Sequence, residues 1–176
     1  DAERVIYKTI LINIKMCKQC ETNPVYEFTN KRKLCKTCFI RWFQKKFFYT
    51  IRKFKMIERG EIIGFSSSNS FRDVVLKDLL KLYSEKGSVE IVKNGRARKI
   101  AISSTTDSEA DEIIHTLIRG NAGRLKQGPV ERIKGKVIIK PLYLFLDKEV
   151  LLYAKLRKLK FIKYEGIERD KISLFV

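Results

Sequence analysis

The chain has 176 residues and carries 38 lysines and arginines against 20 aspartates and glutamates, a formal net charge of +18. A hydrophobic fraction of 44% is typical of a globular protein, and no run of residues approaches the roughly 18 apolar positions of a membrane-spanning helix. The positive charge favours a polyanionic partner, nucleic acid before an acidic membrane surface, and a basic surface that only faces solvent is the alternative.

Residues 1–15 are expected to form an N-terminal extension that is loosely attached to the rest. This segment lacks the basic start, the long apolar stretch and the small-residue cleavage site of a secretory signal. We therefore expect a cytoplasmic protein with no membrane partner, in a reducing compartment where disulfides rarely persist.

A cysteine module follows over residues 16–38. It contains all four cysteines of the chain, arranged as two Cys-x2-Cys pairs: Cys17 with Cys20, and Cys35 with Cys38. Each pair can aim two thiolates at one ion, and two pairs complete the tetrahedral sulfur shell that suits zinc better than iron. We expect a zinc ribbon with one structural zinc ion and no open coordination position; disulfides are the alternative reading.

A long basic helix is predicted next, over about 37–57, within a linker that spans 39–60. Apolar side chains repeat along one face at helical spacing: Phe39, Phe43, Phe47, Ile51 and Phe54. The neighbouring face mixes aromatic residues with the cations Arg41, Lys45, Lys46, Arg52, Lys53 and Lys55. Such a face suits phosphate contacts and stacking on unpaired bases, so these six cations are candidate RNA-binding residues. A solvated amphipathic helix is the alternative.

From 61 to 176 the pattern becomes alternating α/β. Short apolar runs predict strands, and helical patterns separate them. The strands are expected at 61–65, 89–92, 99–102, 137–139 and 161–164, and the helices at 71–85, 107–119 and 147–158. This alternation predicts the α/β class, with a mainly parallel sheet, flanking helices and right-handed crossovers.

Further basic residues lie near turns and helix ends of this domain: Arg96, Arg98, Arg119 and Arg124. Together they are candidates for an RNA-binding track along the carboxyl ends of the strands, where α/β sheets usually bind ligands. The one histidine, His115, lies in an apolar helical stretch with no second base or nucleophile beside it. A packed or partly exposed histidine is therefore favoured over a general base.

Several segments of the chain occur in an order that is characteristic of one protein family. The paired cysteines run into Phe39-Ile-Arg-Trp-Phe43, a basic stretch follows at 50–60, and later segments read Ile118-Arg-Gly-Asn-Ala-Gly-Arg-Leu125 and Ile139-Lys-Pro-Leu-Tyr143 before a helix at 147–157. This order resembles the cytoplasmic tRNA 2-thiolation proteins, which are PP-loop ATPases of the adenine-nucleotide alpha-hydrolase type that place sulfur on the wobble uridine. The resemblance extends from 16 to about 165. It implies a reduced, Rossmann-type PP-loop domain over 61–176 and tRNA as a partner.

The nucleotide loop departs from the family's pattern. Family members read Ser-Gly-Gly-Lys-Asp-Ser after the first strand, where the glycines let the backbone approach phosphates. The same place holds a degenerate loop, Ser66, Ser67, Ser68, Asn69 and Ser70. Bound ATP is not expected, although helix amides could hold an anion weakly. The extra cysteines of catalytic members are missing too, so an iron–sulfur cluster is not expected either.

These losses resemble the second, non-catalytic subunit of the eukaryotic thiolation heterodimer. The resemblance implies that this chain has no catalytic residue. It would bind zinc and tRNA and form a heterodimer with a catalytic PP-loop homologue that 2-thiolates the wobble uridine. Two alternatives stay open: a stand-alone thiolating or adenylating enzyme with an altered loop, and a zinc-dependent RNA-binding protein of another pathway.

Overall fold

The computed structural model of the chain describes residues 16–65, 68–87, 89–93, 97–121, 123, 125 and 128–162. A small antiparallel hairpin, β1 (Tyr26–Glu27) and β2 (Lys33–Leu34), leads into the long helix α2 (Lys36–Lys53). The elements that follow are β3 (Ile62–Phe65), α3 (Phe71–Lys86), β4 (Glu90–Lys93), β5 (Lys99–Ala101), α4 (Thr106–Ile118), β6 (Val130–Ile133), β7 (Lys136–Ile139) and α5 (Asp147–Leu156).

The central sheet has the strand order β4-β3-β5-β7-β6. Neighbouring strands are parallel throughout, except that β6 and β7 form an antiparallel hairpin at one edge. The chain leaves β3 for β4 on one side and then returns to β5 on the other side of β3. The strand order therefore reverses between β3 and β5, and the carboxyl ends of these two strands form the topological switch point of the sheet.

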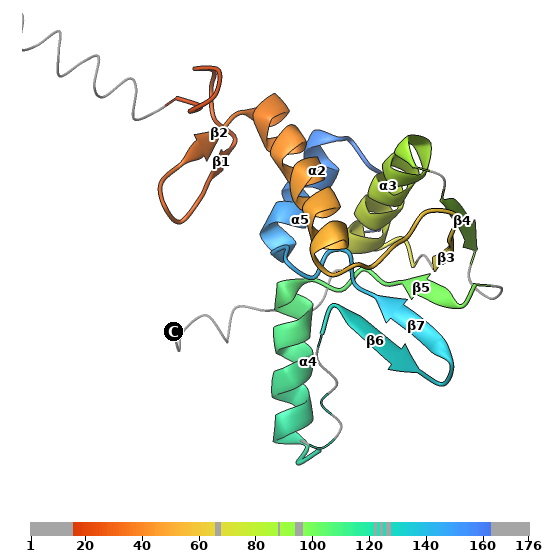
Figure 1. The fold of residues 1–176 in the computed structure, drawn as a ribbon. Coiled ribbons are helices and arrows are strands. Elements are labelled where there is room, and N and C mark those ends of the chain that lie inside the picture. The colour runs from red at the N-terminus through yellow and green to blue at the C-terminus, as the bar shows by residue number, and fades with distance from the viewer. Residues whose placement is uncertain are drawn as a thin grey trace, which may run out of the picture.

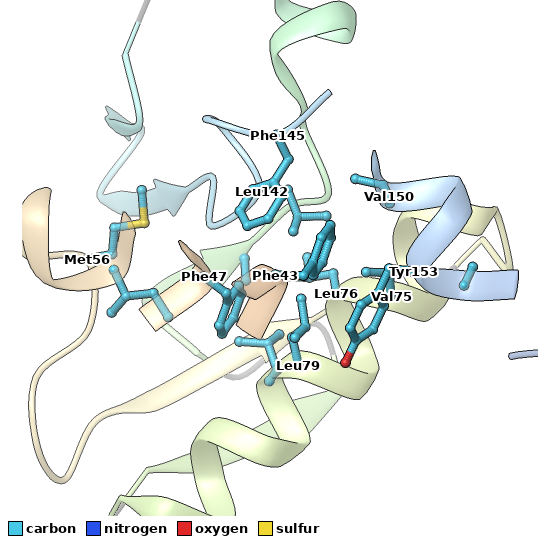
Figure 2. Close-up of a cluster of buried hydrophobic side chains, with 14 of the residues drawn as sticks. Phe43, Phe47, Met56, Val75, Leu76, Leu79, Leu142, Phe145, Val150 and Tyr153 are labelled. Atoms are coloured by element: carbon cyan, nitrogen blue, oxygen red, sulfur yellow. The ribbon is translucent and has the colours of Figure 1, made fainter. Parts of the chain in front are cut away.

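Helices α2, α3 and α5 pack together beside the sheet, whereas α4 extends away from them next to β6 (Figure 1). Figure 2 shows the core between the three packed helices, where Phe43 and Phe47 of α2 meet Leu76 and Leu79 of α3 and Tyr153 of α5. All five side chains are fully buried, and the rings of Phe43 and Tyr153 stack with centroids 4.3 Å apart. The predicted apolar stripe of the basic helix thus faces this core, because one helical face must be removed from water.

The basic helix ends earlier than predicted, at Lys53 rather than near residue 57. Lys55 takes a left-handed conformation with φ +48° and its amide donates to Arg52 O, while the Met56 amide donates to Ile51 O. These two bonds make a Schellman motif, which satisfies the last carbonyls of a helix and stops it. The left-handed position of this motif is usually a glycine, which a sequence shows clearly. Here the position is Lys55, so the sequence does not indicate the end of the helix.

The sheet differs from the expected one at two places. Strand β6 was not predicted, because Val130-Glu-Arg-Ile133 carries charge at two of its four positions. A final strand was predicted at 161–164, but Phe161 and Ile162 lie in no strand, and 163–164 fall outside the described residues. The mainly parallel α/β sheet itself is confirmed.

Candidate functional site

The four cysteines come together in one cluster at the start of the structure. Their Sγ atoms all lie within 4.8 Å of one another, and none of the four forms a disulfide. Cys17, Cys35 and Cys38 are buried, and Cys20 is exposed. The Sγ of Cys20 lies 3.3 Å from that of Cys35 and 3.6 Å from that of Cys38. The fold therefore presents four soft sulfur donors to one point, the donor set of a protein metal centre.

Local backbone structure places these thiols. The first pair lies on a turn in which the Glu21 amide donates to Cys17 O, and this turn is tied to the hairpin by the Lys18 amide on Lys33 O. Cys35 is the N-cap residue of α2, so the second pair lies at the start of that helix. Hydrogen bonds, led by the one from Thr22, lower the pKa of the Cys35 thiol. Cysteines bind metals as thiolates, and the N-terminus of a helix favours the thiolate form.

The cysteine module is fixed to the α/β domain through Glu149, a buried residue in the first turn of α5. Its carboxylate accepts from Lys46 Nζ at 2.8 Å and from the Tyr26 hydroxyl at 3.3 Å. Burial and the Glu149 charge raise the pKa of Tyr26 to about 12, so this hydroxyl keeps its proton and donates. The Lys46 ammonium also lies 4.9 Å from the Trp42 ring centroid. Lys46, a predicted RNA-binding residue, therefore holds two parts of the fold together.

A second polar cluster lies at the switch point, around Asp73 in the first turn of α3. Its Oδ2 accepts from the Ser68 amide at 3.0 Å, from the Ser68 hydroxyl and from the Ser70 hydroxyl at 2.9 Å. Its Oδ1 accepts from Ser103 Oγ at 2.6 Å, in the loop that follows β5. One carboxylate thus joins the two loops that flank the switch point, at the helix N-terminus where an α/β protein of this kind holds an anion.

The degenerate nucleotide loop takes part in this cluster. Ser70 is the N-cap of α3, and its side chain accepts from the Asp73 amide at 3.2 Å. Asn69 has φ +59°, a left-handed conformation that asparagine tolerates better than most residues. Ser66 and Ser67 lie outside the described residues. The Ser-x-x-Asp spacing of Ser70 and Asp73 is a capping signal that the sequence contains, but nothing in the sequence points to Ser103.

Next to this cluster, Asp147 ties α3, α4 and α5 to one another. The Arg72 guanidinium donates to both of its oxygens, at 2.7 and 2.5 Å, and Thr105 Oγ1 donates to Oδ1 at 2.7 Å. The Asp107 carboxylate accepts from the Asp147 amide. Because the guanidinium is engaged in this bidentate pair, Arg72 is not free to bind a phosphate at the carboxyl edge.

The other predicted RNA-binding residues lie on several faces. Lys45 and Arg52 line a hollow between α2 and α3, and Arg41 is exposed on the same helix. Lys53 lies with its ammonium 5.7 Å from the Tyr49 ring centroid. The remaining exposed cation of this stretch, Lys55, follows the helix end.

The predicted track along the carboxyl edge is not formed by the residues that the structure describes. Arg98 comes just before β5 and therefore lies at the amino end of that strand. Arg119 is exposed at the C-cap of α4, and His115 is exposed in the last turn of this helix. Arg96 and Arg124 lie outside the described residues. Among the described helices, none is both long and apolar enough to cross a membrane.

No family model and no curated protein matches this sequence. A solved structure does match the fold: the U34-tRNA thiolase NcsA from Methanococcus maripaludis with its [4Fe-4S] cluster. The TM-score is 0.67 at 16% sequence identity, and the match covers 87% of this chain and 76% of the thiolase chain. The chain has the fold of this thiolase. The predicted fold class, an α/β domain with a mainly parallel sheet behind a four-cysteine module, is confirmed.

The cofactor prediction, structural zinc with no iron–sulfur cluster, is contradicted by this comparison. The thiolase with the same fold was solved with a [4Fe-4S] cluster, so the fold gives no ground for excluding one. The physical reason for the error is that four cysteine thiolates serve both kinds of centre. Ligand spacing in a sequence therefore predicts that a metal centre forms better than it predicts which one.

Proposed function

We propose that this chain is a non-catalytic, tRNA-binding subunit that supports a catalytic PP-loop partner in 2-thiolation of the wobble uridine. The fold shared with a U34-tRNA thiolase supports the connection to tRNA thiolation. The net charge of +18 supports binding to a polyanion such as tRNA.

The observation that carries the non-catalytic part is the Asp73 carboxylate at the switch point. A nucleotide loop works by offering unpaired amides and hydroxyls to phosphates at a helix N-terminus. Here the amide and hydroxyl of Ser68 and the hydroxyls of Ser70 and Ser103 already donate to Asp73. A phosphate would have to displace this carboxylate and would meet its negative charge at a few ångströms, which costs free energy.

The four cysteines are proposed to hold a metal centre. The donor set fits an iron–sulfur cluster, because four cysteine thiolates are the ligands of [4Fe–4S] clusters, and the thiolase of this fold carries one. Such a centre would supply electron-transfer or structural chemistry when bound. Since these are all the cysteines of the chain, a centre that uses the four of them leaves no thiol here to carry a persulfide. This count supports a partner that performs the sulfur transfer.

Three measurements test the proposal. Pull-down from the native cell should recover a catalytic PP-loop homologue, and tRNA affinity should fall steeply across a salt series. Titration calorimetry with ATP and magnesium should give no binding heat. The absence of both a partner and a salt-dependent tRNA affinity would contradict the proposal.

Two other outcomes would select the alternatives. Micromolar ATP affinity together with thiolation of tRNA by the isolated chain would favour a stand-alone enzyme. Crosslinking to total cellular RNA that enriches transcripts other than tRNA would favour an RNA-binding protein of another pathway.

A further inference from the structure

A hollow of about 730 Å³ lies between α2 and α3. Arg59, three residues before β3, and Val89, directly before β4, also line it. The hollow therefore lies toward the amino ends of these strands, away from Asp73 at their carboxyl ends. Its volume is within the range of small-molecule sites. Its lining includes four cations: Lys45, Arg52, Arg59 and Lys86.

The charges of these four cations are not paired within the hollow. None of the ion pairs found among the described residues involves any of them, and no lining residue of the hollow is acidic. All four side chains are exposed to solvent. Like charges gathered in one concave place repel one another, which destabilises the free protein slightly and creates a positive potential for an anion.

Aromatic rings lie among the cations. Phe48 and Tyr83 pack with ring centroids 5.8 Å apart, and the Lys86 ammonium lies 5.0 Å from the Phe48 centroid. Tyr49 is 50% exposed. It follows Lys45 by four residues and precedes Arg52 by three, so the three side chains lie on the same helical face. An exposed ring beside unpaired cations is the arrangement on which single-stranded nucleic acids bind, with bases on the rings and phosphates on the cations.

We propose that this hollow binds an unpaired nucleotide of RNA. The base stacks on the exposed ring of Tyr49, and the flanking phosphates lie against Arg52, Arg59 and Lys86. Bases inside a duplex are stacked on one another and cannot reach the ring, so the site selects loops and single strands. The RNA is a tRNA loop only if the proposed function holds; the nucleotide site itself does not depend on it.

The test is fluorescence anisotropy with the full chain and a labelled single-stranded RNA of mixed sequence, repeated over a salt series. Tyr49→Leu should lower the affinity about tenfold and leave the salt dependence unchanged, because it removes stacking and no charge. Arg59→Gln should lower the affinity and reduce the slope of log K against log salt by about 0.7, the value for one lost phosphate contact.

Arg132→Gln is the matched control. Arg132 is exposed on β6, at the opposite edge of the sheet from β4, and its loss should change affinity less than twofold. A duplex of the same length should bind more weakly than the single strand. Three results would overturn the site: an unchanged affinity of Tyr49→Leu, equal effects of Arg132→Gln and Arg59→Gln, or a duplex that binds as tightly as the single strand.

The same variants separate this site from the proposed function. If tRNA binds no better than unrelated single strands while the variants behave as expected, the hollow is supported and the thiolation role is contradicted. If tRNA binds specifically and the Tyr49→Leu and Arg59→Gln variants retain full affinity, the hollow is contradicted and the thiolation role is untouched.

Discussion

Asp73 accepts hydrogen bonds from both loops at the switch point, and it is buried. Burial alone raises the pKa of its carboxyl group, but the hydrogen bonds from Ser103 and Ser68 outweigh burial and hold the pKa below its usual value. A depressed pKa means that the ionised group stabilises the fold. That contribution is complete above the unfolded-chain pKa of about 3.9 and is lost as the pH falls through the folded-state pKa.

We expect Asp73→Asn to lower the free energy of unfolding by about 1–2 kcal/mol at pH 7, because an amide oxygen is a weaker acceptor for these donors. The difference from the unmodified protein should shrink at pH 3, because this pH lies below the unfolded-chain pKa and the unfolded state then binds a proton that the ionised carboxylate excludes. Urea unfolding at the two pH values measures both effects. Ser103→Ala removes one donor to Asp73. It should lower the free energy of unfolding by less than Asp73→Asn does and should keep the acid dependence of stability. If Asp73→Asn lowers stability equally at pH 7 and pH 3, Asp73 is not ionised in the folded protein.

Cys38 is a buried member of the cysteine cluster in the first turn of α2. Cys38→Ser should lower the metal bound per chain and the melting temperature of the protein, since a hydroxyl is a poor replacement for a thiolate. Elemental analysis together with acid-labile sulfide measures the first effect, and matched amounts of iron and sulfide would identify a cluster. Equal metal content in the variant and the unmodified protein would contradict the role of Cys38 as a ligand.

Among the secondary-structure elements, three helices end in the same way, with a left-handed residue just after the last turn. After α4, Gly120 takes φ +68° and the Asn121 amide donates to Thr116 O. Lys55 after α2 and Lys158 after α5 take the same left-handed conformation, with φ +48° and +55°. Glycine reaches this conformation without the steric cost that a Cβ brings. The end of α4 was therefore readable from its glycine, whereas the predicted ends of the other two helices were too late.

The left-handed Lys158 predicts a stabilising substitution. Lys158→Gly should raise the free energy of unfolding by about 0.5–1 kcal/mol, because relief of the strained backbone exceeds the entropy that glycine adds to the unfolded chain. Lys158→Ala removes the same charge and keeps the Cβ, so it should give no gain. Urea unfolding of the two variants checks this, and an equal gain in both would assign the effect to charge.

At the scale of the whole molecule, Glu149 joins the cysteine module and the basic helix to α5. Besides its bonds with Lys46 and Tyr26, its carboxylate accepts from the Leu146 amide at 3.2 Å. Lys46 and Glu149 are separated by 103 residues in the sequence. Their pairing therefore forms only when the domain has folded around α2.

Glu149→Ala should lower the free energy of unfolding by about 2–4 kcal/mol, because it leaves the partly buried Lys46 ammonium and Tyr26 hydroxyl without their acceptor. Lys148→Ala, at the neighbouring exposed position of α5, should change stability by less than about 0.5 kcal/mol. Thermal unfolding measures the difference. Similar losses in the two variants would show that Glu149 contributes only as a residue of the helix.

The local elements were predictable to a large extent. Apolar repeats at helical spacing located α2, α3, α4 and α5, and short apolar runs located four of the five strands in the main sheet. These signals lie within each segment, because a helix or a strand must bury one face regardless of which element packs against it. Strand β6 was not predicted because two of its four residues are charged. Of the strand expected at 161–164, the described residues Phe161 and Ile162 lie in no strand, so apolar side chains also occur together where the chain packs without strand pairing.

The sequence by itself determined the two Cys-x2-Cys pairs, the mainly parallel α/β class and the positive charge, because each follows from residue type and spacing along the chain. The tertiary structure alone decided how the Asp73 cluster and the hollow between α2 and α3 are built. Ser103 reaches Asp73 from 30 residues away, and Arg59 and Lys86 join Lys45 at one hollow only because α2 packs against α3. Such convergence depends on which buried faces meet, and burial between distant segments leaves no local periodicity to read.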